Sequence, residues 1–325
     1  MNEAQVTGVD SYIEELERFG ISFANTSTED ARKFLTTNTY YQKFRSYLGR
    51  APQKDDFSGV DFQDLVELSR IDFSLSRQVL TLALSIEHAL KIQIWQLAES
   101  GGKGFLKKCL DSLDEKRTEE EKFSGRKVQT SDYSRTYLDA PSTHGTDLKV
   151  YHCELWELLE SLSFGDIIQL YSAAVKVGKC TKPIQYHFLK RIQELRNAAS
   201  HENCLLARTP KTGDEKRNFS KQCDIYCFSR SCFSDSNDSC LSAEKKQKEL
   251  SRLFLHDFCI LLYVHRSIVT SSGMQKHAVC ELSCLSDRIK KGQENFKTRS
   301  CQFMSEVNAT LSGIQNAIEQ FISSV

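Results

Sequence analysis

An arginine, an amide and a histidine lie within six residues of one another, directly after an amphipathic pattern: Arg196, Asn197 and His201. A guanidinium is permanently charged and pairs with phosphate oxygens, and an imidazole exchanges protons near neutral pH. Together these groups could cleave a phosphodiester without a metal ion. A metal-independent ribonuclease is therefore the leading hypothesis, with these three residues as the catalytic candidates and no cofactor or metal.

The segment before these residues has the pattern of an amphipathic helix. Pro183 stands where such a helix would begin, and apolar residues recur after it at intervals of four, four, three and four: Ile184, Phe188, Ile192, Leu195 and Ala199. At about 100° per residue this stripe fills an arc of under about 90°, and the candidate residues fall on the opposite face. They are thus predicted to face away from the core contact of their own helix.

Composition and charge limit the class of protein. A chain of 325 residues can form one large domain or two ordinary ones. Its 43 basic and 43 acidic side chains cancel, so any RNA contact must use a local patch. The 4 prolines and 15 glycines favour helices. Apolar runs are too short for a membrane span, and the polar N-terminus is unlike a secretory signal. We expect a cytoplasmic protein without membrane contact.

The cysteines and the remaining histidines offer alternative sites. Secreted disulfide scaffolds are usually short, so most of the 12 thiols in this chain are expected to be reduced and partly buried. Four gather in a polar, Ser-rich stretch: Cys223, Cys227, Cys232 and Cys240. Their spacing matches only part of a zinc pattern, so free thiols in a surface insertion are preferred over a metal site. Four histidines in apolar-periodic segments are expected to be core or helix-surface residues: His88, His187, His256 and His265.

The strongest apolar periodicity runs from Phe62 to Leu97, without Pro or Gly. It predicts one very long helix or two consecutive ones, with an apolar face wide enough to be central. Asp72, Arg77 and Glu87 interrupt the pattern. They form either a buried polar set or an exposed polar stripe.

Apolar residues recur at helical intervals in several other segments, and no alternating β pattern of convincing length occurs. The expected fold is all-α, with further helices at Ser11–Gly20, Thr28–Leu35, Glu154–Val175 (interrupted near Phe164-Gly165), Glu249–Val269 and Phe303–Val325. We predict an N-terminal helical region at 1–60, a helical domain at 61–272 and a C-terminal helical tail at 273–325. Polar insertions are expected near 101–150, as a helix and a long loop, and near 207–245.

Tyr40, Tyr41, Phe44 and Tyr47 lie on one face of a further helix, with Lys43, Arg45 and Arg50 between them. Aromatic and basic side chains of this kind can bind nucleic acid. An aromatic core face with solvated charges opposite explains the spacing equally well. We favour the core interpretation, because apolar stripes at this period are usually buried.

Several separated segments together resemble the Abi-like (AbiD/AbiF-type) abortive-infection proteins, which are built on a HEPN-type helical domain. The resemblance covers about Ser11 to His201. It includes an opening helix (Glu15–Ile21), an Asn-Tyr-Tyr box (Thr37–Leu48) and a helix with an aspartate and an Ile-Glu pair (Leu65–Gln93). A Trp-to-Phe-Gly segment (Leu155–Gly165) and the HEPN signature (Arg196–His201) follow. Relatives continue past the histidine with a basic residue and a Leu-Trp-Asn group, whereas this chain continues with Glu202–Leu206.

The resemblance implies a HEPN-like helical bundle with an N-terminal helical extension, acting in bacterial phage defence. It implies an endoribonuclease toxin that cleaves RNA by attack of the ribose 2′-OH and arrests growth, as a homodimer. His201 would be the general acid or base, Arg196 would hold phosphate oxygens, and Asn197 would orient the ring or the substrate. A regulatory noncoding RNA or an antitoxin is a further candidate partner. The alternative is a non-catalytic HEPN scaffold that binds RNA or a partner protein.

Overall fold

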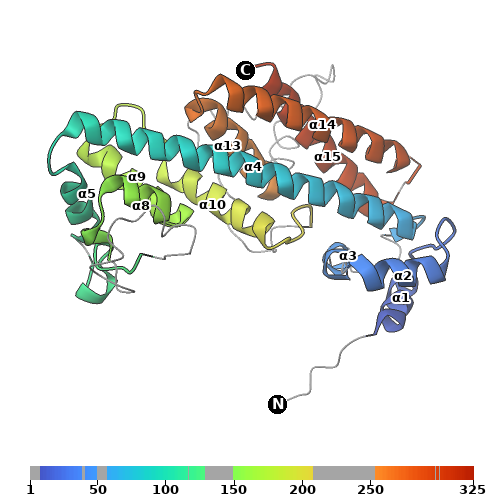
Figure 1. The fold of residues 1–325 in the computed structure, drawn as a ribbon. Coiled ribbons are helices and arrows are strands. Elements are labelled where there is room, and N and C mark those ends of the chain that lie inside the picture. Colours follow the sequence, from blue (N-terminus) through green and yellow to red (C-terminus); the bar gives the residue numbers. More distant parts are fainter. Residues whose placement is uncertain are drawn as a thin grey trace, which may run out of the picture. The chain divides into compact units, whose positions relative to one another are not determined.

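The computed structural model describes residues 8–38, 41–49, 57–115, 117–128, 149–207, 253–296, 298–299 and 301–325. Within these ranges the chain is all-α, as predicted (Figure 1). The same ranges hold no β-strand, only the isolated bridges Ser22–Asp61 and Lys127–Lys149. The insertion predicted near 207–245, with its four cysteines, lies almost wholly outside the described residues.

The chain forms two compact units. The first contains Met1–Leu82, Leu195–Arg266 and Ser272–Val325, and the second contains Ala83–Glu194 and Ser267–Ser271. Three of the described helices contribute to both units: α4 (Phe62–Gly101), α10 (Tyr186–Ser200) and, by its last two residues, α13 (Leu253–Ile268). The division at residues 60 and 272 drawn from the sequence stays a prediction.

The segment with the strongest periodicity is one helix, α4, of 40 residues. No Gly or Pro interrupts it before Gly101, and Gly102 follows with a φ of 68°, a conformation that glycine adopts without strain. Of the three charged residues that were singled out as interrupting its apolar pattern, Asp72 is fully buried and Arg77 is exposed, while Glu87 is half-buried. Both interpretations, a buried polar set and an exposed polar stripe, are therefore wrong, because the three side chains do not share an environment.

The rest of the first unit consists of helices packed on its part of α4 or on each other. They are α1 (Val9–Arg18), α2 (Thr28–Asn38), α3 (Tyr41–Leu48), α13 (Leu253–Ile268), α14 (Ser272–Phe296) and α15 (Gln302–Ile322). α1 packs on α2, and α14 lies beside α15 (Figure 1). The periodicity did not single out α14, because its buried positions include Ala278, Ser286 and Gly292 among the large apolar residues.

Two aromatic residues of α3 belong to the core of the first unit. Phe44 and Tyr47 are both fully buried, and the Phe44 ring meets the Phe62 ring edge-on at 5.6 Å between centroids. This confirms the core interpretation for these two residues. Tyr40, Arg50 and the side chain of Tyr41 lie outside the described residues. Lys43 was expected in solvent and is instead buried, because it pairs with a buried carboxylate.

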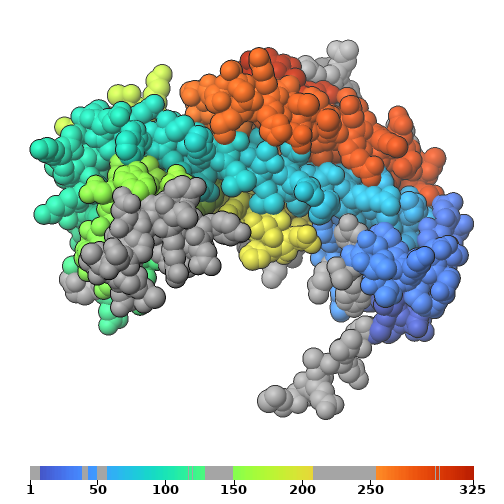
Figure 2. Space-filling view, in the orientation of Figure 1, coloured from blue at the N-terminus to red at the C-terminus, as the bar shows by residue number. Residues whose placement is uncertain are grey.

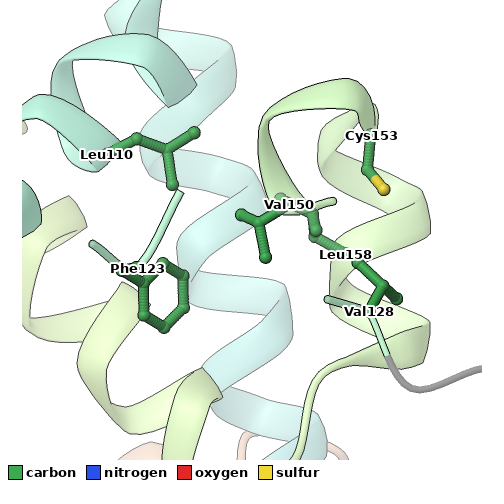
Figure 3. Packing of buried hydrophobic residues seen from close by; sticks show 6 residues of the cluster. All are labelled: Leu110, Phe123, Val128, Val150, Cys153 and Leu158. Atoms are coloured by element: carbon green, nitrogen blue, oxygen red, sulfur yellow. The ribbon is translucent and has the colours of Figure 1, made fainter. Parts of the chain in front are cut away.

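The second unit packs α5 (Phe105–Asp114), α8 (Leu155–Ser161) and α9 (Phe164–Val177). α5 packs on α9. A small cluster of buried side chains joins α5, α8 and the segments between them (Figure 3): Leu110, Phe123, Val128, Val150, Cys153 and Leu158. Two short 3-10 turns, η2 (Glu119–Glu121) and η4 (Val150–His152), flank this cluster. The guanidiniums of Arg117 and Arg126 lie 5.8 Å and 5.2 Å from the centroid of the Phe123 ring.

Two helix boundaries differ from the sequence expectation. The break expected near Phe164-Gly165 lies just before it, because the Ser163 hydroxyl accepts the amide of Asp166 at 3.3 Å and caps α9. The helix expected to start at Pro183 begins at Tyr186 instead. The amide of Ile184 donates to the Tyr171 hydroxyl at 3.2 Å, which holds the preceding residues in a turn.

Candidate functional site

The end of α10 carries the three candidate residues on its solvent-facing side. Leu195 and Ala199 are buried, whereas Asn197 and His201 are exposed and Arg196 is partly exposed. In Figure 2 the end of α10 (yellow) lies at the molecular surface. The predicted separation between a buried stripe and an outward polar face is confirmed for these residues. Along the rest of the stripe, Phe188 and Ile192 are also buried and Ile184 is half-buried.

His201 is the C-cap residue of α10, directly after the last helical residue Ser200, and the next residue closes the turn. The amide of Glu202 donates to the carbonyl of Ala199 at 3.1 Å, and the amide of Asn203 donates to the carbonyl of Ala198 at 3.0 Å. This pair of bonds is the Schellman motif, in which the residue after the cap adopts the left-handed conformation. Glu202 does so with a φ of 52°. Glycine usually fills that position, so this chain holds its candidate histidine next to a strained residue.

Within one chain the candidate residues are linked through Asn197. The Arg196 Nη1 donates to Asn197 Oδ1 at 3.2 Å, and the amide of His201 donates to the Asn197 carbonyl at 3.1 Å. Among the described residues, no hydrogen bond joins the imidazole of His201 to either side chain. Residues five apart on a helix diverge by about 140°, so the guanidinium and the imidazole of one chain point in different directions.

The segment after His201 is anchored in the core of the first unit. Leu205 and Leu206 are buried, and the amide of Leu206 donates to Asp72 Oδ1 at 2.9 Å. The thiol of Cys204 lies 3.9 Å from the same oxygen. On its other side, Asp72 Oδ2 accepts from Lys43 Nζ at 3.0 Å. Asp72 therefore connects α3, α4 and the turn that carries His201.

The charges in this cluster are shaped by burial. Burial raises the pKa of Asp72, and the Lys43 ammonium and the backbone amides of Leu205 and Leu206 counteract part of that rise. Burial, followed by the charge of Asp72, raises the pKa of Cys204 strongly, which keeps it a protonated thiol. Burial also raises the pKa of Tyr47 well above its ordinary value, and nearby Cys204 and Asp72 add to the effect. The cluster thus holds one ion pair and two neutral groups.

The sequence drew attention to Asp72 but not to its partners. Lys43 is 29 residues from Asp72 and Leu206 is 134 residues from it, so no local pattern joins them. An aspartate within an otherwise apolar helix face was the only available signal, because a buried carboxylate needs a cation or amide partner. It could not show which cation supplies that partner.

The described part of the chain holds no disulfide and no cluster of metal-binding side chains. Its eight cysteines are free, and Cys280 and Cys284 are the exposed ones. No group of three or more His, Cys, Asp or Glu within those ranges is placed to hold a metal ion. The metal alternative for Cys223, Cys227, Cys232 and Cys240 lies outside the described residues. No helix in the described ranges has the length and apolar character needed to cross a bilayer.

These features define an all-α protein with a polar Arg-Asn-His face at the end of a helix. Comparison with family models matches residues 33–207 to the family described as Abi-like protein. The match spans more than half of the chain, and the chain belongs to this family, whose name points to abortive infection as a defence against phage. In the same comparisons, no curated protein and no solved structure matched the chain.

Proposed function

We propose that this Abi-like protein is a HEPN endoribonuclease of the AbiD/AbiF type that cleaves RNA without a metal ion and thereby arrests growth during infection. The observation that carries the proposal is the outward placement of Arg196, Asn197 and His201 at the end of α10, opposite its buried face. Exposed polar residues on a rigid helix can reach a large, charged substrate. The family match adds the biological setting.

In the proposed reaction, the ribose 2′-oxygen attacks the adjacent phosphorus and the bond from phosphorus to the 5′-oxygen breaks. His201 removes the proton from the 2′-OH or supplies one to the leaving 5′-oxygen. Arg196 binds the nonbridging oxygens and offsets the negative charge that develops on them. Asn197 orients the ring or the substrate. The products are a 2′,3′-cyclic phosphate and a free 5′-OH.

Two copies of the chain are part of this proposal. The C-terminal end of a helix carries a partial negative charge, which disfavours a phosphate. A site at the end of α10 therefore needs the guanidinium to offset that charge. Because Arg196 and His201 of one chain diverge, pairing two polar faces across a two-fold axis would supply both groups to one phosphodiester. RNA is the proposed substrate, a second copy the proposed partner, and a noncoding RNA or an antitoxin the proposed regulator.

The direct test is incubation of the purified protein with labelled single-stranded RNA and excess chelator. We expect cleavage with 2′,3′-cyclic phosphate ends, lost in His201→Ala and in Arg196→Ala. Tight binding of intact RNA by the wild type would instead identify a non-catalytic scaffold. In bacteria, wild-type expression is expected to stop growth and degrade RNA, and growth arrest by the His201→Ala protein as well would contradict a chemical cause.

A further inference from the structure

The residues after His201 are tied to a helix that precedes them by more than a hundred positions. Asp72 uses one carboxylate oxygen to accept the amide of Leu206 and the other to accept Lys43 Nζ, at 2.9 Å and 3.0 Å. Leu206 lies five positions after the candidate histidine. A single buried carboxylate therefore transmits the position of α3 to the segment that leaves α10.

Burial makes this connection strong and makes each part dependent on the others. The side chains of Lys43 and Asp72 are only 8% and 0% exposed, so water does not screen their attraction. Removing one partner of such a pair leaves an uncompensated charge in the interior, which is strongly destabilising. Without Lys43, the Asp72 carboxylate must take up a proton or move toward solvent. Either change weakens its bond to the Leu206 amide.

The turn at His201 needs such support because it contains a strained residue. Glu202 holds a left-handed φ of 52°, a conformation that is strained for a non-glycine residue. A conformation of that kind persists only where surrounding contacts impose it. On the far side of the turn, those contacts are the bond from Leu206 to Asp72 and the buried Leu205 and Leu206 side chains.

We propose that Asp72 is a positioning residue for His201 and that Lys43 holds Asp72 in place for this task. The imidazole keeps its working position only while α3 is docked on α4 through the Lys43–Asp72 pair. This inference rests on the proposed nuclease function and adds a means of regulating it. A partner that displaces α3 lowers turnover without touching the RNA contacts of Arg196.

The connection from Lys43 through Asp72 to the Leu206 amide is called the clamp below. Hydrogen exchange of the full-length protein tests the clamp without any assay of RNA. The informative comparison is Lys43→Met/Asp72→Leu against Lys43→Met/Asp72→Asn, because both lack the buried ion pair and only the second keeps an oxygen that can accept the Leu206 amide. Replacing a buried ion pair by apolar residues of similar size often leaves stability unchanged. We expect the amides of residues 203–206 to exchange at least about tenfold faster in the Leu variant than in the Asn variant.

The matched control is Asp64→Asn, on the same helix. Asp64 Oδ2 accepts from Arg299 Nε at 2.8 Å, and the side chains of Asp64 and Arg299 are 6% and 25% exposed, so the variant loses an ion pair of a buried carboxylate without touching the turn. Exchange at residues 203–206 should stay at the wild-type rate in this variant. Equal exchange in the two double variants, or equal acceleration in Asp64→Asn, would overturn the clamp.

Kinetics then test whether the clamp positions His201. If the wild type cleaves RNA, the Leu double variant should lose about tenfold to a hundredfold in kcat with KM unchanged, because the imidazole is displaced while the RNA contacts remain. The Asn double variant should retain more of the wild-type kcat. A loosened turn with unchanged kcat would reject the positioning role. A wild type that does not cleave RNA would reject the nuclease proposal, while the exchange result still decides the clamp.

Discussion

Gly292 on α14 faces Ile71 on α4 so closely that a Cβ atom added to the glycine would lie 2.5 Å from Ile71 Cδ1. Polar contacts hold the same two helices together on either side. Arg288 Nη2 lies 2.6 Å from Glu67 Oε1, and Gln78 Nε2 donates to Glu281 Oε2 at 2.9 Å. The close approach therefore joins two segments far apart in sequence into the core of the first unit.

Gly292→Ala should destabilise the protein although alanine favours helices. The new methyl group would displace the fully buried Ile71 side chain, and overpacking of this kind typically costs about 1–3 kcal/mol. Urea unfolding followed by circular dichroism measures the change. Gly292→Ala/Ile71→Val should recover part of the loss, since valine lacks the clashing Cδ1. Equal losses in the single and double variants would show that the contact is not responsible.

Glu202→Gly should stabilise the protein, because glycine adopts the left-handed conformation of this position without steric cost. The expected gain in the free energy of unfolding is about 1 kcal/mol. Glu202→Val should lower it, since a β-branched residue fits a positive φ poorly. Glu202→Gln controls for the charge and should stay near the wild type. If Glu202→Gln raised the free energy of unfolding as much as Glu202→Gly, the effect would be electrostatic.

The helical fold was readable from the sequence where one apolar face is continuous. The Phe62–Leu97 pattern identified α4, because large apolar residues recur at helical intervals along its whole length, although polar residues such as Asp64, Ser69 and Gln78 are buried beside them. The same pattern did not identify α14, because this helix buries Gly292 and Ser286 against its neighbours. Small or polar residues do not contribute to an apolar periodicity even when they are buried. Long-range packing, unlike the helical period, leaves no local trace.

The outward face of the candidate site was also predictable, because Leu195 and Ala199 fix which side of α10 is buried. The support beneath it was not. Lys43 was expected in solvent, because nothing in the residues around it indicates a carboxylate on another helix. Likewise, Glu202 looked like a charged neighbour of His201, and only the backbone geometry shows that it closes the helix.

Arg196→Ala and His201→Ala should remove RNA cleavage while leaving stability nearly intact. Neither side chain is buried, so the change in the free energy of unfolding is expected within about 0.5 kcal/mol. Leu195 is next to Arg196 in the chain but is buried, so Leu195→Ala should lower the free energy of unfolding by about 2–5 kcal/mol through the cavity it leaves. Thermal unfolding of the three variants provides the comparison. A large destabilisation by either exposed substitution would mean that the side chain has a structural role.

A further buried titratable group, His265, lies in α13. His265 is fully buried, and its ring meets the Phe321 ring edge-on at 5.6 Å between centroids. Neither ring nitrogen has a hydrogen-bond partner among the residues that the structure describes. Burial lowers the pKa of His265 from 6.5 to about 4, because an environment with little water disfavours the charged imidazolium.

The stability of the protein should therefore fall as the pH is lowered from 6.5 to 4. In this window the unfolded chain binds a proton at His265 and the folded chain does not, so protons favour unfolding. A pKa difference of this size corresponds to roughly 3 kcal/mol in the free energy of unfolding. Urea titrations across the window measure it. His265→Leu places an apolar side chain that cannot titrate in this position. It should reduce the pH dependence of the free energy of unfolding by that amount. An unchanged slope in His265→Leu would show that other groups control the acid response.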